Sequence, residues 1–311
     1  MNELLESIIS EIEKTVVGKR DAIEKVMMAV LADGHILLDD VPGVGKTTLA
    51  VALGKALGIK YHRIQFTPDV LPSDIVGFSV FNKETGSFIY LPGIVNDTNL
   101  LLADEINRTS SRTQAALLEA MEENQVTVDG KVYPLHRPFI VIATQNQVGT
   151  AGTQRLPHAQ LDRFLVRLSI GYPDFESQKE IIRERQRKDF MDDMISVTDV
   201  AGLLELQKKT LEINMSDEIT DYITSLTFAS RDSDLTELGI SPRGAVAVSH
   251  MAKACALLKG RDYVIPEDVT EIFGDVCAHR LILSRKARAE QMSGADVIEH
   301  ILTETHKPFS V

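Results

Sequence analysis

The sequence predicts an α/β protein in which a parallel β-sheet covered by helices is followed by a smaller, all-helical domain. In the first half of the chain, short apolar runs alternate with helical patterns, as they do in a sheet wound by helices. After Tyr172-Pro173-Asp174 the chain is mostly amphipathic helix, with turn signals at 239–242 and 265–266. We therefore expect a boundary near Pro173, with domains spanning residues 1–173 and 174–311.

Short runs rich in Leu, Ile and Val are the candidate strands, because strands buried on both faces have nearly continuous apolar sequence. The runs are His35–Asp39, Arg63–Phe66, Asn99–Ala103, Pro138–Ala143 and Phe164–Ile170. Helical stretches lie between them, including Thr47–Leu57 and Ser111–Glu123. In the second stretch, one apolar face is formed by Leu117, Leu118 and Met121.

Two segments interrupt this rhythm with the apolar and polar alternation that is typical of β-hairpins. Phe78–Leu91 alternates around a polar centre at 82–86. Val126–Tyr133 alternates around Asp129-Gly130, a strong two-residue turn signal. We expect two hairpins, and their residues alone leave open whether these serve a function or decorate the surface.

The composition is that of a globular protein and disfavours several function classes. The 311 residues are 44% hydrophobic and 25% charged, with a formal net charge of −12. Because so acidic a surface repels phosphate backbones, nucleic acid is not an expected partner. Cys255 and Cys277 are too few for a disulfide framework and are expected to fill the core.

Neither a secretory signal nor a membrane segment is apparent. The first residues, Met1–Glu6, carry acids where a secretory signal carries basic residues. No uninterrupted apolar run approaches the ~18 residues that a membrane-spanning helix needs. We expect a cytoplasmic protein.

The segment Asp40–Thr48 has the pattern of a phosphate-binding loop. It contains Gly-Val-Gly-Lys-Thr, follows a predicted strand and opens a predicted helix, which is the context that such a loop requires. Gly43 and Gly45 let the backbone approach a phosphate chain, and the amides at the helix N-terminus favour its negative charge. Asp40 stands where glycine is usual, but that position starts the turn and is not expected to line the phosphates.

This loop is predicted to hold ATP and Mg²⁺. Lys46 places a compact cation on the β- and γ-phosphates, and the Thr47 hydroxyl is placed to ligand Mg²⁺. The residues expected to cradle the nucleotide are Pro42, Gly43, Val44, Gly45, Lys46, Thr47 and Thr48.

Two acids, Asp104 and Glu105, follow the apolar run that ends at Ala103. A strand that ends in this way directs both carboxylates out of the carboxyl edge of the sheet, where ligands of open α/β sheets bind. Asp104 suits the metal shell, and Glu105 can orient or deprotonate the attacking water. Such a pair of acids is weak evidence on its own, but together with the phosphate-binding loop it predicts an ATP hydrolase.

Asn146 follows a further predicted strand, and its amide could hold the lytic water or a γ-phosphate oxygen. On residue type alone, an asparagine in an ordinary turn fits equally well. Hydride transfer is disfavoured, because the glycine spacing is not that of a dinucleotide fold. A GTPase is disfavoured because the Asn82-Lys83 pair precedes Asp104 and lacks an Asp two places later.

Taken in order, these motifs resemble those of AAA+ ATPases, and specifically of the MoxR family. The matching stretches are Leu37–Thr47, Gln65–Gly77, Leu101–Arg108, Ala115–Glu122, Ala143–Asn146 and Ala159–Phe164, with Val16-Val17-Gly18 near the start and Gly239–Arg243 near the end. The resemblance covers nearly the whole chain and is specific, because generic phosphate-loop proteins share only the first stretch. It implies a P-loop AAA+ αβα domain with hairpin insertions, followed by a helical lid.

The resemblance also implies roles for residues outside the loop. Asn146 matches the first sensor, Arg163 the finger that reaches the neighbouring subunit's ATP, and Arg243 the second sensor, on the lid. The residues of the adenine site would be Val16, Val17 and Gly18. The hairpins correspond to insertions that tend to face the axial region of a ring.

Some residues between sensor and finger depart from the family pattern. Gln147 stands where proline is usual, Gln154-Arg155 replaces a Tyr-Pro pair, and His158 stands where Glu is common. None of these changes removes a catalytic group, but together they leave the geometry between Asn146 and Arg163 open.

The function that the resemblance implies is ATP-driven work on a protein client. A ring, of six subunits by family expectation, would remodel or mature the client or assist its metal insertion, with a partner bearing a von Willebrand factor A domain. Two alternatives are a small-molecule kinase and a nucleic-acid motor. The motor is disfavoured by the net charge of −12 and by the few basic residues near the hairpins, namely Lys83, Lys131 and Arg137.

Overall fold

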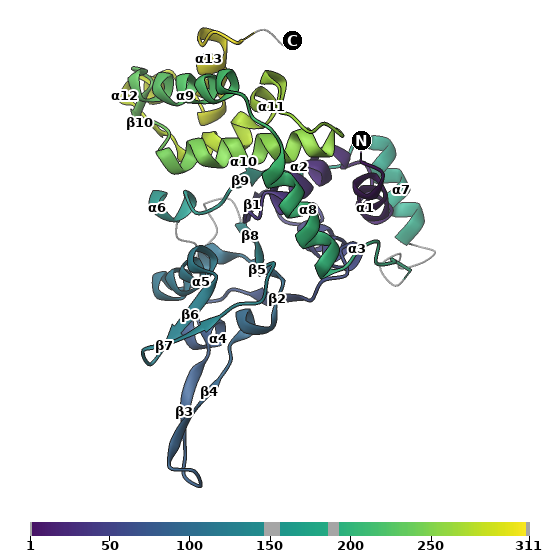
Figure 1. Cartoon of the computed structure of the whole chain (residues 1–311), viewed down its shortest axis with the longest axis vertical. Helices are drawn as coiled ribbons and strands as arrows, with labels where there is room; N and C mark the ends of the chain where they lie inside the picture. The colour runs from purple at the N-terminus through teal and green to yellow at the C-terminus, as the bar shows by residue number, and fades with distance from the viewer. Residues whose placement is uncertain (1, 146–155, 186–192, 309–311) are drawn as a thin grey trace.

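The computed structural model describes residues 2–145, 156–185 and 193–308. They form a central body built on a sheet, a helical region at one end and a long hairpin that projects from the other end (Figure 1). The predicted sensor Asn146 lies outside the described residues, as do Gln147 and Gln154-Arg155. Within the described ranges, no helix is both long enough and apolar enough to cross a membrane.

All five candidate strands are confirmed as one parallel sheet, in the order β2-β5-β8-β1-β9. Their bounds are β1 Ile36–Asp39, β2 Tyr61–Gln65, β5 Leu100–Asp104, β8 Ile140–Gln145 and β9 Val166–Leu168. Asp39 pairs in register with Gln145, and Gln65 pairs with Asp104. The carboxyl ends of the strands therefore meet at one edge of the sheet, which we call the carboxyl edge; the opposite one is the amino edge.

Both faces of the sheet are covered by apolar packing, which explains why its strands are continuously apolar. Leu100 and Leu102 face one hydrophobic cluster, and Leu101 and Ala103 face the other. The elements around the sheet are α1 Glu3–Glu13, α2 Arg20–Leu31, α3 Lys46–Ala56, α4 Pro72–Val76, η1 Ile94–Asp97, η2 Ile106–Arg108, α5 Ser111–Glu123, α6 His158–Leu161 and α7 Phe175–Arg185.

The C-terminal region is helical, as predicted, and it shares the larger hydrophobic cluster with α1, α2 and α3. Its elements are α8 Val200–Glu212, α9 Asp217–Asp232, β10 Thr236–Leu238, α10 Pro242–Leu258, α11 Pro266–Cys277, η3 Ala278–Arg280, β11 Ile282–Leu283, α12 Arg285–Ala289 and α13 Gly294–Glu304. The strands β10 and β11 form a short antiparallel pair, so the region is not purely helical. Cys255 and Cys277 are buried in it.

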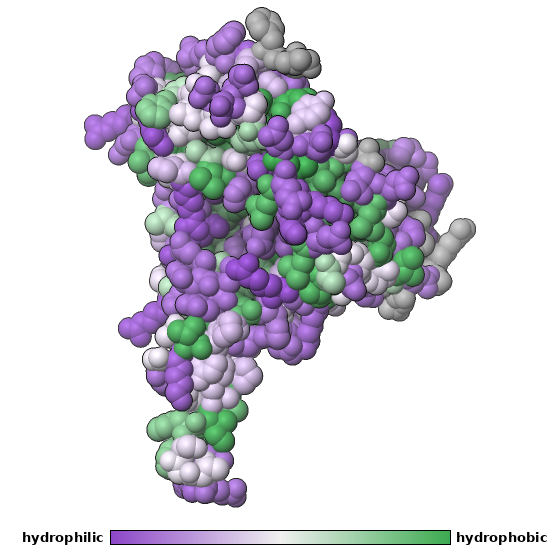
Figure 2. Space-filling view, in the orientation of Figure 1, coloured by the Kyte–Doolittle hydropathy of each residue, from purple (hydrophilic) through white to green (hydrophobic). Residues whose placement is uncertain are grey.

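Both predicted hairpins are confirmed. They consist of β3 Phe78–Asn82 with β4 Ser87–Leu91, and of β6 Gln125–Val128 with β7 Lys131–Pro134. The rings of Tyr90 and Tyr133 stack with centroids 3.9 Å apart and join the two hairpins. The β3–β4 hairpin projects well beyond the body, and Figure 2 shows apolar surface gathered near its far end. Exposed apolar residues occur along the whole hairpin: the pair Phe78 and Leu91 lies at its base, Val80 and Ile89 in its middle, and Phe81 and Phe88 near its tip.

Candidate nucleotide site and arginine cluster

The phosphate loop lies at the carboxyl edge, between β1 and α3. Gly43 and Gly45 have left-handed backbones, with φ of +87° and +97°, a conformation that glycine adopts without steric cost. A Cβ atom built at either glycine would meet nothing within 4 Å. The loop therefore surrounds open space that its own side chains do not fill, as a cradle for phosphate requires.

Lys46 begins α3 and is only 7% exposed. Its Nζ donates a hydrogen bond to the main-chain carbonyl of Asp40, at 2.8 Å. Burial lowers the pKa of Lys46, and the nearby negative charges oppose that shift. These charges belong to Asp40, Asp104, Asp39 and Glu105. The predicted cation and the predicted acids thus share one site.

Asp40, which departs from the usual loop pattern, has a structural role. Its carboxylate accepts hydrogen bonds from the Ser169 hydroxyl at 2.8 Å and from the Gly171 amide at 3.2 Å. It also accepts one from the amide of Ile170. The side chain therefore turns away from the open space of the loop and ties the loop to the end of β9.

Thr144, which the sequence analysis did not single out, positions both acids from the adjacent strand β8. Its hydroxyl donates to Oδ1 of Asp104 at 2.5 Å and accepts from the amide of Glu105 at 2.9 Å. Glu105 has a left-handed backbone, with φ of +57°, which costs a non-glycine residue about 1–3 kcal/mol. The bond to Thr144 helps to hold this strained turn. The sequence signal that could have identified Thr144 is a hydroxyl residue one position before the end of a predicted strand.

Each acid also pairs with an arginine of its own chain. Nη2 of Arg63, on β2, lies 2.7 Å from Oδ2 of Asp104. Nη1 of Arg108 lies 2.7 Å from Oε2 of Glu105. Because each arginine is more than 40% exposed, these pairs are weak and can be exchanged for other partners.

The oxygen ligands available at the carboxyl edge fit Mg²⁺. In nucleotide sites Mg²⁺ takes one or two protein ligands and completes its shell with phosphate oxygens and water. Asp104 supplies a carboxylate at the end of β5, and Thr47 supplies a hydroxyl in the first turn of α3. Residues 2–145, 156–185 and 193–308 contain no group of three or more His, Cys, Asp or Glu placed to hold a metal by themselves.

The segment predicted to contact adenine, Val16-Val17-Gly18, is partly buried in the fold. Val16 is 6% exposed and belongs to the hydrophobic cluster, while Val17 is half-buried. Gly18 has φ of +69°, and a Cβ there would lie 2.0 Å from Oγ of Ser177. Gly18 is therefore required for the close approach of α7.

Arg163 and Arg243 lie together, away from the phosphate loop. Nε of Arg163 is 3.2 Å from Oε2 of Glu122, and Nη1 of Arg243 is 2.7 Å from Oε1 of the same carboxylate. The three residues line a cavity of about 240 Å³. We call Glu122, Arg163 and Arg243 the arginine cluster.

The arginine cluster lies at the amino edge of the sheet. Other residues that line its cavity directly precede strands: His35 precedes β1, Phe139 precedes β8 and Leu165 precedes β9. The phosphate loop follows the opposite end of β1, and a four-residue strand rises about 13 Å. One chain therefore does not bring Arg163 or Arg243 to its own phosphate loop.

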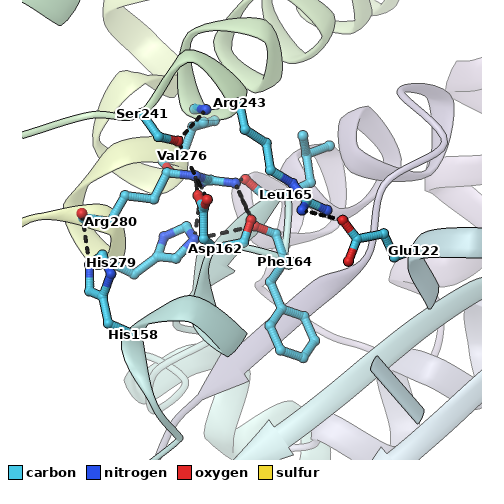
Figure 3. A network of polar contacts seen from close by, with 11 residues as sticks. Glu122, His158, Asp162, Phe164, Leu165, Ser241, Arg243, Val276, His279 and Arg280 are labelled. Atoms are coloured by element: carbon cyan, nitrogen blue, oxygen red, sulfur yellow. Dashed lines mark hydrogen bonds and ion pairs between the residues drawn. The ribbon is translucent and has the colours of Figure 1, made fainter. Parts of the chain in front are cut away.

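A network around buried Arg280 joins the segment that precedes and follows Arg163 to the C-terminal helical region (Figure 3). Arg280, 3% exposed, donates to Oδ1 of Asp162 at 2.8 Å and to the carbonyl of Phe164 at 2.7 Å. Nε2 of His158 lies 2.8 Å from the carbonyl of Arg280. His158, which departs from the family pattern, thus adds a contact between the segment before Arg163 and the C-terminal helical region.

The sheet order, the phosphate loop, the paired acids and the helical lid together define a P-loop ATPase of the AAA+ class. Comparison with known families agrees, since the family described as "ATPase family associated with various cellular activities (AAA)" matches residues 35–166. The AAA lid domain matches residues 228–301. Because residues 167–227 lie between these matches, the boundary near Pro173 stays a prediction.

Individual relatives narrow the class. YeaC of Bacillus subtilis is 42% identical over 99% of this chain and 96% of its own length. Chaperone MoxR1 of Mycobacterium tuberculosis is 37% identical over 98% of this chain and 82% of its own. The crystal structure of a candidate ATPase from Cytophaga hutchinsonii superposes with a TM-score of 0.89, at 38% identity, over 98% of this chain and 95% of that one. The chain belongs to the MoxR family of AAA+ ATPases, and it is an ATP-hydrolysing enzyme.

Proposed function

We propose that the protein works as a ring in which each ATP is held by one subunit and completed by Arg163 and Arg243 of its neighbour. The observation that carries this proposal is the separation of the two arginines from the phosphate loop by the depth of the sheet. A chain with a donor edge and an acceptor edge forms head-to-tail contacts, which close into a ring when the rotation allows. Six subunits is the family expectation.

Within each site, the residues of the carboxyl edge hold the nucleotide. Lys46 neutralises the β- and γ-phosphates, Thr47 and Asp104 hold Mg²⁺, and Glu105 activates the water. When bound there, Mg²⁺ would supply Lewis-acid stabilisation of the charge on the phosphates. Asn146, outside the described residues, is proposed as the sensor of the γ-phosphate. Val17 offers its half-buried side chain to the adenine, while Val16 and Gly18 shape that segment.

The proposed work of the ring is to remodel or mature a protein client in the cytoplasm, or to assist metal insertion into it, with a von Willebrand factor A domain partner. Two observations support a protein client. MoxR1, 37% identical to this chain, is named a chaperone. The projecting hairpin carries exposed aromatic residues, including Phe81 and Phe88, whose rings pack edge to face at 5.4 Å, and surface of this kind is enriched where proteins bind proteins.

The test is the rate of ATP hydrolysis per subunit as a function of protein concentration, with Glu105→Gln as the blank. A shared site gives a specific rate that rises as rings assemble and falls when Arg163→Ala subunits are mixed in. A flat rate that the mixed subunits leave unchanged would mean that each chain works alone. Client action is tested by adding a von Willebrand factor A domain protein and, in parallel, duplex DNA. Stimulation by DNA instead of protein contradicts the proposed client.

A further inference from the structure

Glu122 holds two cations that come from separate parts of the chain. It lies near the end of α5, whereas Arg163 follows α6 and Arg243 lies in the first turn of α10. One carboxylate oxygen faces Nε of Arg163 at 3.2 Å, and the other faces Nη1 of Arg243 at 2.7 Å. Figure 3 shows Glu122 and Arg243 extending toward each other.

Stability is a poor explanation for this arrangement. The side chains of Glu122, Arg163 and Arg243 are 35%, 31% and 45% exposed, and ion pairs with that exposure contribute about 0–1 kcal/mol each. Two guanidinium groups that share one small region repel each other, and a carboxylate between them offsets that repulsion. The carboxylate thus keeps the arginines together in a place that they would otherwise leave.

The backbone around the cluster is anchored, so its charged groups start from fixed positions. The ring of His35 lies 2.9 Å from the carbonyl of Met121, the residue before Glu122. Asp162, the residue before Arg163, pairs with buried Arg280. The hydroxyl of Ser241, which caps α10 just before Arg243, lies 3.4 Å from Asp162. The freedom that remains is in the side chains, and Glu122 restricts it.

The contacts with Glu122 leave donors for a phosphate. A guanidinium carries five N–H donors. Arg163 contacts Glu122 through Nε, and its two Nη atoms carry four further N–H donors. Arg243 uses Nη1 and keeps Nε and Nη2. Both arginines can therefore contact an oxyanion while Glu122 still holds them.

We propose that Glu122 is a positioning residue that aims Arg163 and Arg243 as one unit at the ATP of the neighbouring subunit. This inference rests on the proposed shared site. Holding the side chains before ATP arrives reduces the entropy lost in the transition state, and small misplacements of such groups are costly in rate. Glu122 acts through the arginines and does not itself touch the nucleotide.

The first measurement compares Glu122→Gln with Glu123→Gln, which removes the same charge at the next position of α5. At a protein concentration that saturates assembly, we expect Glu122→Gln to lower kcat about 10- to 100-fold. KM for ATP and the melting temperature are expected to match those of Glu123→Gln, because the phosphate loop is at the other edge. A kcat equal to that of Glu123→Gln, or a fall explained by loss of folded protein, overturns the proposal.

A second experiment, in which two impaired variants are mixed, tests the role of Glu122 separately from the proposed shared site. In an equal mixture of Glu122→Gln and Glu105→Gln, an intact phosphate loop meets intact arginines at about one interface in four, since subunits join head to tail. We expect activity to recover toward that fraction, and the same recovery when Arg163→Ala replaces Glu122→Gln. Recovery with Arg163→Ala alone overturns the role of Glu122 and leaves the proposed function standing. Recovery with neither variant overturns the shared site and the role of Glu122 with it.

Discussion

The two edges of the sheet differ in how they are built. At the carboxyl edge, the groups predicted to hold ATP come from short continuous segments, a loop and a strand end, and hydrogen bonds such as those of Thr144 fix the strand end. At the amino edge, the arginine cluster is assembled from α5, the segment after α6 and the lid. The predicted nucleotide-binding edge and the proposed activating edge therefore face opposite ways, and in the proposed ring neither edge would suffice alone.

The largest expected effect tests the amino edge. Arg163→Ala is expected to lower hydrolysis by about 10³-fold or more, because an arginine supplied to the transferring phosphoryl group has that effect. Nucleotide binding by the isolated subunit is expected to stay unchanged, as measured with a fluorescent ATP analogue. Arg288→Ala, which removes an arginine that pairs with Glu237 in the C-terminal region instead, is the control. Weaker binding by the Arg163→Ala subunit would place that arginine at its own site and break the comparison.

Lys46→Ala tests the carboxyl edge with the opposite pattern. Removing a largely buried cation that faces phosphate is expected to raise the Kd for ATP about 10²- to 10³-fold. Titration calorimetry on the single subunit measures this. Lys55→Ala, in the last turn of the same helix, is expected to bind normally. Unaltered ATP binding by the Lys46→Ala subunit would contradict the assignment of the phosphate loop to the nucleotide site.

Mild acid is expected to lower the stability of the fold through His35, which lies at the amino edge. Burial lowers the pKa of His35 to about 4, from 6.5. Between these values the unfolded chain binds a proton that the folded chain does not, so stability falls as the pH falls from 6.5 to 4. The loss from this residue approaches about 3 kcal/mol.

Urea unfolding at pH 7, 6 and 5 measures this loss. Burial also lowers the pKa of His250 and His279, so the comparison uses single variants. His35→Gln is expected to flatten the dependence on pH, whereas His136→Gln, an exposed position, keeps it. Equal slopes in the two variants would show that His35 is not the titrating group.

The smallest effect concerns the ion pair of half-exposed Arg63 with buried Asp104. Because this arginine competes with Mg²⁺ for the carboxylate, Arg63→Ala is expected to lower the Mg²⁺ concentration for half-maximal hydrolysis about 2- to 5-fold. Lys60→Ala, which removes a cation paired with Asp97 instead, serves as the control. A higher Mg²⁺ requirement in Arg63→Ala would mean that Arg63 orients Asp104 for the metal.

Sequence reasoning located the carboxyl edge well because its parts are local. A phosphate loop needs two glycines and a lysine in sequence, and an acidic strand end needs an apolar run before it, so both are visible in one stretch of chain. The parallel sheet and both hairpins were predicted for the same reason, from periodicity. The partners that hold the acids were missed, because Thr144 and Arg63 lie on neighbouring strands, and strand order is not written in any one segment.

The sequence by itself determined the family and the ATPase chemistry, because the motifs that carry them are set by residue types at short spacing. The roles of the loop, the acids and the two arginines stay predictions. Only the tertiary structure decided that the arginines meet at Glu122 on the edge away from the phosphate loop. That contact joins α5 to residues as far along the chain as Arg243, and the packing of the lid against the sheet brings them together. Side chains so distant in sequence acquire a common site only through the fold.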